Sequence, residues 1–167
     1  MFARLVSIPD VPPGVCVPDR FELTPAAYQE FLSTTSLRPF IAGQLRRYHH
    51  GADLLAVGAA IRTAFAYAEM PVGLARRITA AYQSLGGEGT AVVVRSEGEI
   101  FRNVRTSRDL LAACKRCFAA LFSDQAIALR EEQGVDHLSV MVSVTVQRMV
   151  RASLVEADVR TPVGAAR

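Results

Sequence analysis

The sequence has few of the residues on which several common chemistries depend. Of its 19 basic residues only Lys115 is a lysine, so an amine nucleophile or Schiff base could come from that side chain alone. There are three cysteines and no tryptophan. Cys114 and Cys117 have the spacing of a metal or redox pair, but a structural zinc site needs four ligands and no second pair exists. We interpret both residues as small apolar positions on one face of a helix.

Long hydrophobic runs are absent as well. Every apolar stretch is interrupted well before the roughly 18 residues that a membrane-spanning helix needs, and the N-terminus is a poor signal peptide. We therefore expect no membrane segment and a cytoplasmic protein. The net charge is +3, and arginines adjoin only at Arg46-Arg47 and Arg76-Arg77. This scattered pattern does not favour nucleic acid as a partner.

The composition that remains suits a folded domain. Half of the 167 residues are hydrophobic and 21% are charged, which is enough for one core and too apolar for a disordered chain. Thr24 followed by Pro25 predicts the start of a helix, and Gly51 predicts the end of the next one. Ser107 and Ser123 are predicted caps of two later helices. The predicted helices span residues 26–32, 37–50, 52–68, 74–85, 107–122 and 124–133.

Four short strands complete the prediction, near residues 14–17, 90–95, 100–104 and 138–148. The last one reads LSVMVSVTVQ, in which apolar and semi-polar residues alternate with a period of two. Such alternation is typical of a half-buried strand. The fold class is therefore α+β, with helices packed on a small mixed or antiparallel sheet. We expect one domain over residues 1–153 and a disordered tail over 154–167.

One predicted hairpin raises a question about function. In VVVRSEGEIFRNV, residues 92–104, a buried strand ends at Arg95 and the chain is apolar again at Ile100. An arginine at the end of an apolar strand is suited to an anion, because its guanidinium is a planar fork of donors. The connection between the two strands, however, is very short.

Several segments together resemble the N-terminal ATP-grasp domain of the phosphoenolpyruvate synthase and pyruvate phosphate dikinase family. They occur in the family's order and cover roughly residues 10 to 153. The stretch from Leu110 to His137 is the most specific of them. The matching segments are VPPG at 11–14, then LTPAAYQEFL, VVVRS, FRNV, LLAACKRCFAALFSDQAIALREEQGVDH and VSVTVQRMVRAS.

The resemblance implies a partial ATP-grasp N-terminal lobe that binds ATP, weakly if at all without its missing parts. The family's "VRSS" arginine contacts nucleotide phosphates, and here that position is Arg95. The glutamine of the family's "VQ-M-V" motif lies on the strand toward the adenine side, and here it is Gln147. Physical chemistry leaves alternatives open for both residues: a salt bridge from Arg95 to Glu97 or Glu99, and a plain polar position at a strand edge for Gln147.

The sequence also departs from the family pattern. The family carries a long loop rich in Ser, Ala and Gly after "VRSS", whereas this chain has only the four residues 96–99. Two of them are Glu97 and Glu99, whose carboxylates would repel a phosphate. The family's "GGK" lysine and the acidic Mg²⁺ ligands of its second lobe have no counterpart in this sequence. Mg²⁺ would therefore require a partner lobe that supplies its ligands.

Other polar residues receive structural interpretations. His49 and His50 lie at a predicted helix end, where positive charge is favourable. We interpret Asp136-His137 as a turn before a strand, and Glu131-Glu132 as a solvated helix face.

Three functions remain open, and whether the chain is an enzyme is left open with them. The chain could be a truncated dikinase-family nucleotide-binding domain without turnover of its own. It could be a non-catalytic interaction module, because a lobe without its partner lobe exposes apolar surface and favours self-association or another chain. It could be one half of a phosphotransferase completed by another polypeptide. Catalysis by the chain alone is not expected, because phosphoryl transfer depends on positioning and on charge neutralisation by metals and cations.

Overall fold

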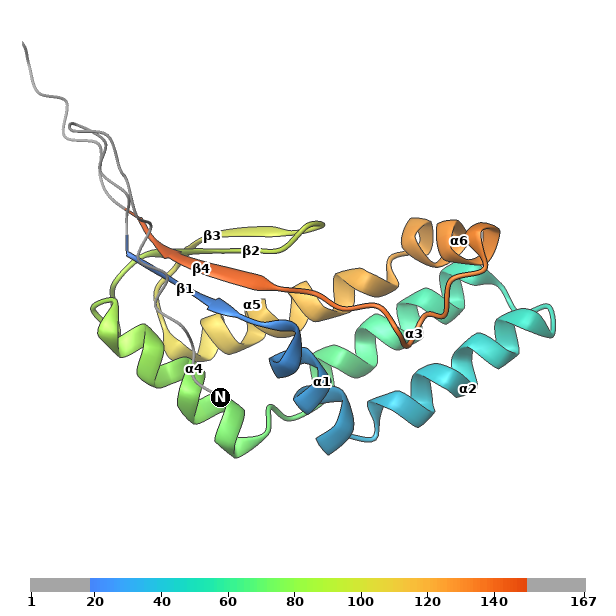
Figure 1. Ribbon diagram of the computed structural model, residues 1–167, viewed down its shortest axis with the longest axis horizontal. Helices are drawn as coiled ribbons and strands as arrows, with labels where there is room; N and C mark the ends of the chain where they lie inside the picture. The colour runs from blue at the N-terminus through green and yellow to red at the C-terminus, as the bar shows by residue number, and fades with distance from the viewer. Residues whose placement is uncertain (1–18, 150–167) are drawn as a thin grey trace, which may run out of the picture.

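The computed structural model describes residues 19–149. This part of the chain consists of one small sheet and a set of helices packed on it, which confirms the α+β prediction (Figure 1). In chain order they are β1 (Arg20–Leu23), α1 (Pro25–Thr34), α2 (Leu37–His49), α3 (Leu54–Tyr67), α4 (Val72–Ser84), β2 (Val92–Arg95), β3 (Ile100–Val104), α5 (Ser107–Ala119), the 3-10 helix η1 (Ala120–Phe122), α6 (Asp124–Gln133) and β4 (Val144–Arg148).

The strands form one antiparallel sheet in the order β1-β4-β2-β3. Because side chains alternate along a strand, one face of the sheet carries the apolar residues. That face packs on the helices, with α1 against β1 and α5 against β2 and β3. Figure 1 shows α1, α4 and α5 on this side of the sheet. The buried residues of this face are Phe21, Leu23, Val92, Val94, Val104, Val144 and Val146.

A cluster of aromatic side chains forms the centre of the helical layer. Phe31 lies 5.9 Å from Phe65 and 5.5 Å from Phe118 between ring centroids, and Phe65 lies 5.6 Å from Phe122. All four are fully buried. Tilted and offset aromatic pairs at these distances stabilise a core beyond the area that they bury. The cluster joins α1, α3, α5 and η1 into one body.

The ends of the helices confirm some predicted signals and correct others. The Ser123 hydroxyl accepts from the Ala126 amide at 3.2 Å and caps α6 as predicted. The cap of α5 is Thr106, not Ser107, and its hydroxyl accepts from the Asp109 amide at 3.1 Å. Thr24 does precede α1, but its side chain makes no capping bond there, so proline at the first turn is the remaining helix-start signal.

Lys115 has a structural use. Its ammonium donates to the carbonyls of Ala66 at 2.6 Å and Ala68 at 3.0 Å, which lie at the C-terminal end of α3. A cation is favoured at that end of a helix because the last carbonyls lack intrahelical partners. The chain's sole lysine therefore fastens α3 to α5.

The strand predictions were only partly right. β1 was not predicted, and the strand expected at 14–17 lies outside the described residues. β4 begins at Val144 rather than near 138. The two strands that pair with β4 end at this point, since Leu23 is the last residue of β1 and pairs with Val144, and Arg95 is the last residue of β2 and pairs with Thr145. Residues 138–143 keep part of the alternating burial, but no strand within residues 19–149 lies beside them to form a ladder.

The predicted domain boundary at 153 and the predicted tail also lie outside the described residues. Within residues 19–149 no helix is long and apolar enough to cross a membrane. Cys114 and Cys117 are buried on α5, as their helical interpretation requires. Burial raises the pKa of both thiols, that of Cys117 to about 11, so neither is a thiolate at neutral pH.

Candidate functional site: the open face of the sheet

The face of the sheet that points away from the helices carries polar side chains. We call it the open face, and none of its residues is fully buried. Direct cross-strand partners point to the same side of a sheet, so the register assigns all of its members except Arg102. Arg102 is placed by its alternation with Phe101, which packs against the core. The open face comprises Arg20, Glu22, Val93, Arg95, Ile100, Arg102, Thr145 and Gln147.

Arg95 lies on this face as the last residue of β2. It pairs with Ile100 of β3 and Thr145 of β4, and its side chain is exposed. Its alternative interpretation was a salt bridge to Glu97 or Glu99. Within residues 19–149 Arg95 makes no ion pair with either carboxylate. The guanidinium is therefore directed to a surface on which no described residue neutralises it.

Gln147 lies on the same face of the neighbouring strand. It pairs with Val93 of β2 on one side and with Arg20 of β1 on the other. Since Arg95 pairs with Thr145, two residues earlier on β4, Arg95 and Gln147 are diagonal neighbours. Such neighbours lie roughly 7–8 Å apart. The structure thus brings together the two residues that the sequence singled out, although they are 52 positions apart (147 minus 95).

The connection between β2 and β3 is a tight turn, as its length predicted. The Ser96 amide donates to the Glu99 carbonyl at 2.9 Å, which leaves Glu97 and Gly98 at the tip. The return strand contains a bulge, in which Asn103 has a φ of 59°. Asparagine tolerates this left-handed conformation better than most residues.

Only one of the two glutamates of the turn lies where its carboxylate would repel an anion on the open face. Glu99 pairs with Ser96 across the turn, one position on from Arg95, and therefore points toward the helices. Consistent with this placement, the charge of Glu99 adds to the burial that raises the pKa of Cys117 on α5, while the Ser96 hydroxyl opposes the rise. Of these two glutamates only Glu97, at the exposed tip, is left to repel a phosphate near Arg95. Glu22 of β1 lies on the open face as well, in the cross-strand row of Thr145 and Arg95.

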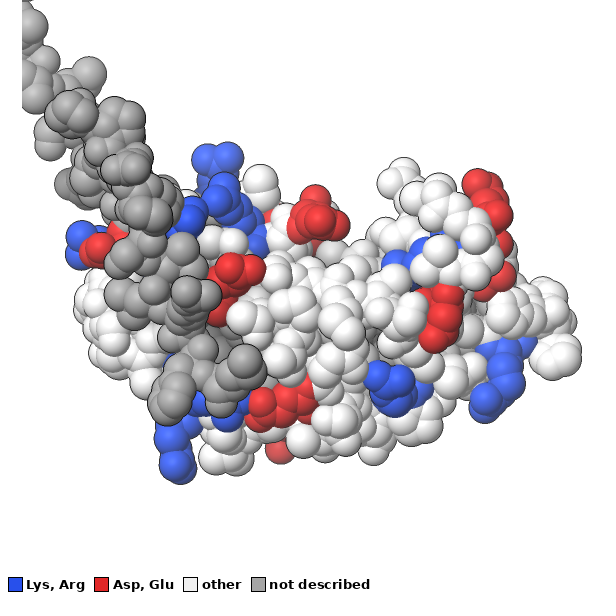
Figure 2. All heavy atoms as spheres, viewed as in Figure 1, with Lys and Arg blue, Asp and Glu red and all other residues white. Residues whose placement is uncertain are grey.

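Sequence reasoning missed two further arginines of the open face. Arg20 lies on β1, the strand that was not predicted, and Arg102 lies between Phe101 and the bulge of β3. The signal for Arg102 was present in the sequence, because it alternates with Phe101, which packs against the core. Figure 2 shows basic side chains gathered over the hairpin strands and an acidic group at the hairpin tip.

The polar residues near α6 form a separate cluster at the other end of the molecule (Figure 1). His137 is buried, and its Nδ1 accepts from Arg130 Nε at 3.0 Å. Its Nε2 therefore carries the proton and donates to Glu131 at 2.6 Å, while His49 Nε2 lies 2.9 Å from the same carboxylate oxygen. The prediction of a solvated face was thus wrong for Glu131, which instead joins α2 to α6. Among residues 19–149 no side-chain hydrogen bond or ion pair connects this cluster to Arg95 or Gln147.

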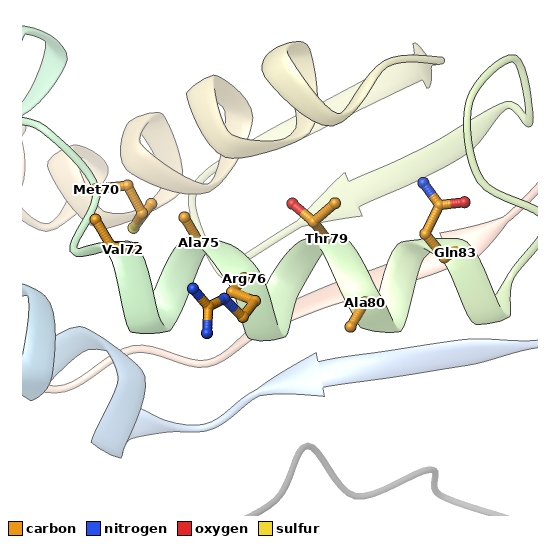
Figure 3. Close-up of a pocket in the computed structure, with 7 residues that line it drawn as sticks. All are labelled: Met70, Val72, Ala75, Arg76, Thr79, Ala80 and Gln83. Atoms are coloured by element: carbon orange, nitrogen blue, oxygen red, sulfur yellow. The ribbon is translucent and has the colours of Figure 1, made fainter.

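Two grooves of about 520 Å³ each lie on the helical layer, away from the open face. One runs along α4 (Figure 3), and its lining residues are Met70, Val72, Ala75, Arg76, Thr79, Ala80 and Gln83. The other lies beside α2 and α3, with Phe40 and Tyr67 among its lining residues. Arg95 and Gln147 line neither of these two grooves.

Comparison with known proteins agrees with the resemblance seen in the sequence. The family model described as pyruvate phosphate dikinase, AMP/ATP-binding domain, matches residues 3–161. A phosphoenolpyruvate synthase of Pseudomonas aeruginosa (strain UCBPP-PA14) is 37% identical over 164 residues, with 83% of this chain and 20% of that protein covered. The phosphoenolpyruvate synthase of Escherichia coli (strain K12) is 33% identical over 164 residues, with 87% and 21% covered. The chain thus spans about a fifth of the length of these relatives.

Proposed function

Since the chain belongs to the family of the pyruvate phosphate dikinase AMP/ATP-binding domain, we propose that its open face binds ATP. The single observation that carries this proposal is the convergence of Arg95 and Gln147 on one exposed sheet face. In the proposal Arg95 contacts the phosphates and Gln147 contacts the adenine side. The nucleotide-binding unit comprises residues 1–153.

The chemistry of the two side chains supports these roles. The Arg95 guanidinium offers several N–H donors in a plane, which suits the oxygens of a phosphate. Gln147 offers both a donor and an acceptor through its amide, as recognition of a base edge requires. Val93 lies directly beside Gln147 on β2 and provides an apolar neighbour for a purine ring.

The proposed role is nucleotide binding without turnover by this chain alone. Phosphoryl transfer needs charge neutralisation on the transferred group, usually with metal ions. In the described part of the chain no group of three His, Cys, Asp or Glu residues could hold a metal ion. Mg²⁺ ligands would then come from a partner lobe on another chain. Phosphotransfer to pyruvate, the role that the family resemblance implies, would require that lobe as well.

A second candidate function is a protein-interaction module, in which a second copy or a partner lobe covers the open face. The observation that favours it is the exposed apolar side chain of Ile100 beside Arg95. In the nucleotide proposal a partner lobe would close over bound ATP, whereas in the interaction proposal it would bind the face directly. The two functions differ in whether ATP binds the isolated chain.

Thermal unfolding of the purified chain with and without MgATP tests the nucleotide proposal. A ligand at 100 times its Kd stabilises the folded state by about 2.7 kcal/mol, which shifts Tm by several degrees at this size. We expect Arg95→Ala to abolish the shift. The matched control is Arg76→Ala, which removes an exposed arginine from the α4 groove and should leave the shift intact.

An unchanged Tm at millimolar MgATP would contradict the nucleotide proposal. A concentration-dependent Tm without nucleotide, together with a dimeric mass in solution, would instead support the interaction module. A shift that Arg76→Ala abolishes and Arg95→Ala preserves would place the ligand in the α4 groove.

A further inference from the structure

We propose that two copies of this chain associate through the connection between α3 and α4. This connection, residues 67–72, forms a ridge on the helical layer, because the side chains at its two ends project from it: Tyr67 is 84% exposed and Val72 is 75% exposed. Large apolar side chains exposed within one short segment mark an interaction surface, whereas single ones are ordinary. The ridge lies away from the open face, so the inference goes beyond the proposed function and does not depend on it.

The ridge separates the two grooves of about 520 Å³ on the helical layer. Met70 and Val72 line the start of the α4 groove (Figure 3), whereas Tyr67 and Glu69 line the groove beside α2 and α3, together with Phe40. A projecting segment beside hollows of this kind is a self-complementary shape, since the ridge of one copy can fill a groove of another. A two-fold axis lets both copies do so at once, which is the commonest symmetry of soluble oligomers.

The charges beside the ridge indicate which partner fits. Glu69 lines the groove beside α2 and α3, and Arg76 lines the α4 groove. Both are exposed, and within residues 19–149 neither forms an ion pair. One charge of each sign cancels over the surface, so it does not attract a polyanion such as nucleic acid or an anionic membrane. A partner needs an apolar surface with the same two charges in inverse positions. A second copy supplies both, because a two-fold axis brings Glu69 of each copy to Arg76 of the other.

The ridge is held in place by contacts within its own chain. The Lys115 ammonium donates to the carbonyls of Ala66 at 2.6 Å and Ala68 at 3.0 Å, on either side of Tyr67. Phe65 before the ridge and Leu74 after it are both buried in the core. Since the backbone of the ridge is fixed before a partner binds, association orders few residues and loses little conformational entropy.

The size of the surface sets the expected strength of the dimer. Seven residues line the α4 groove and nine line the other. A standard interface has roughly 20–30 residues on each side, so this one is small. We therefore expect a dissociation constant in the micromolar range. The apolar side chains of the ridge supply most of the attraction, and the two pairs of Glu69 with Arg76 fix the orientation.

Sedimentation velocity of the full chain over a series of protein concentrations tests the dimer. Glu69→Arg or Arg76→Glu places like charges together at both symmetry-related contacts, and each should weaken association by about 10-fold or more. The double variant with both reversals restores opposite charges at each contact. Its dissociation constant should return to within about 3-fold of the parent's.

Two exposed residues outside both grooves provide matched controls. Arg46→Glu on α2 changes the net charge as Arg76→Glu does, and Glu132→Arg on α6 changes it as Glu69→Arg does. Both controls should associate as the parent does, to within about 2-fold. Tyr67→Ser removes the most exposed apolar side chain of the ridge and should weaken association by about 10-fold. The Tm of the monomer should stay unchanged in that variant, because the side chain is exposed.

Loss of the dimer in the single reversals and its rescue in the double variant would establish the ridge as the interface. A chain that stays monomeric at millimolar concentration would overturn the inference, and so would a dimer that both single reversals leave intact or one that the double variant does not restore. A dimer that Arg95→Gln abolishes and Glu69→Arg does not would place the contact on the open face and overturn the inference as well. ATP binding by the reversal variants should equal that of the parent, so failure of the nucleotide proposal is observed separately from failure of the dimer.

Discussion

Two ends of this molecule hold arginines in opposite ways. Near α6, Arg130 is buried and donates to two acceptors, His137 Nδ1 at 3.0 Å and the Leu121 carbonyl. On the open face, Arg95 is exposed and makes no ion pair with any residue from 19 to 149. A buried arginine whose donors are satisfied contributes to the fold, whereas an exposed and unpaired arginine is available to a ligand.

Replacing Arg130 should therefore have the largest effect on stability. Arg130→Met leaves the His137 acceptor and the Leu121 carbonyl without their donors in a buried place, which costs about 3 kcal/mol. Arg95→Met should change the free energy of unfolding by less than about 0.5 kcal/mol, as exposed substitutions usually do. Urea unfolding of both variants measures the difference. Equal losses of unfolding free energy in the two variants would contradict the distinction between the two ends of the molecule.

The close packing of α3 against α6 offers the next test of this comparison. A Cβ at Gly58 would lie 2.2 Å from Asp124 Oδ1, the atom that pairs with Arg62 at 2.8 Å. Gly58→Ala should thus cost about 1–2 kcal/mol, because displacement of the carboxylate outweighs the better helix propensity of alanine.

The matched control is Gly43→Ala on α2, where the nearest atom to a new Cβ is 3.9 Å away. That variant should be stabilised by about 0.5–1 kcal/mol. Thermal unfolding of both proteins decides the point, and a stabilised Gly58→Ala would mean that α6 packs less closely on α3 than described.

Two buried tyrosines extend the comparison to the core. The Tyr28 hydroxyl has no hydrogen-bond partner among the described residues, and burial raises its pKa. The Tyr82 hydroxyl donates to the Thr90 carbonyl at 2.8 Å. Removal of an unpaired buried hydroxyl should be neutral or stabilising, so Tyr28→Phe should gain up to about 1 kcal/mol while Tyr82→Phe loses about as much. A higher denaturant midpoint for Tyr82→Phe than for Tyr28→Phe would contradict this account.

The smallest expected effect is a pH dependence at Glu131. Hydrogen bonds from His49 and His137 lower its pKa below the ordinary value of 4.5. Because the folded-state pKa is the lower one, its stabilisation is full above pH 4.5 and is lost as the pH falls through the folded value. Glu131→Gln should therefore be less stable than the parent at neutral pH, and the difference should close in acid.

Glu132→Gln is the control for that pH series, since Glu132 is an exposed neighbour on α6. Its Tm should follow the parent's at every pH. A Glu131→Gln variant that also follows the parent throughout would show that the contact between α2 and α6 contributes nothing measurable.

The sequence predicted most helices, because helix starts, ends and apolar stripes depend on local patterns. Gly51 ends α2 and Ser123 caps α6 as expected. The structure was needed where the outcome depends on contacts between distant segments. The alternating residues 138–143 have no partner strand in the described part of the chain. Glu131 contacts His49, which lies 82 positions away on another helix. Arg20 joined the site only because an unpredicted strand pairs with β4.

The central claim is that nucleotide binds the open face, and residue-resolved NMR of the chain during an ATP titration tests it most directly. The account predicts that the largest amide shift changes lie along β2, β3 and β4 around Arg95, Arg102 and Gln147, with α4 and α6 unaffected. Changes concentrated along α4 beside the groove of Met70 and Gln83, or no changes at saturating ATP, would contradict it.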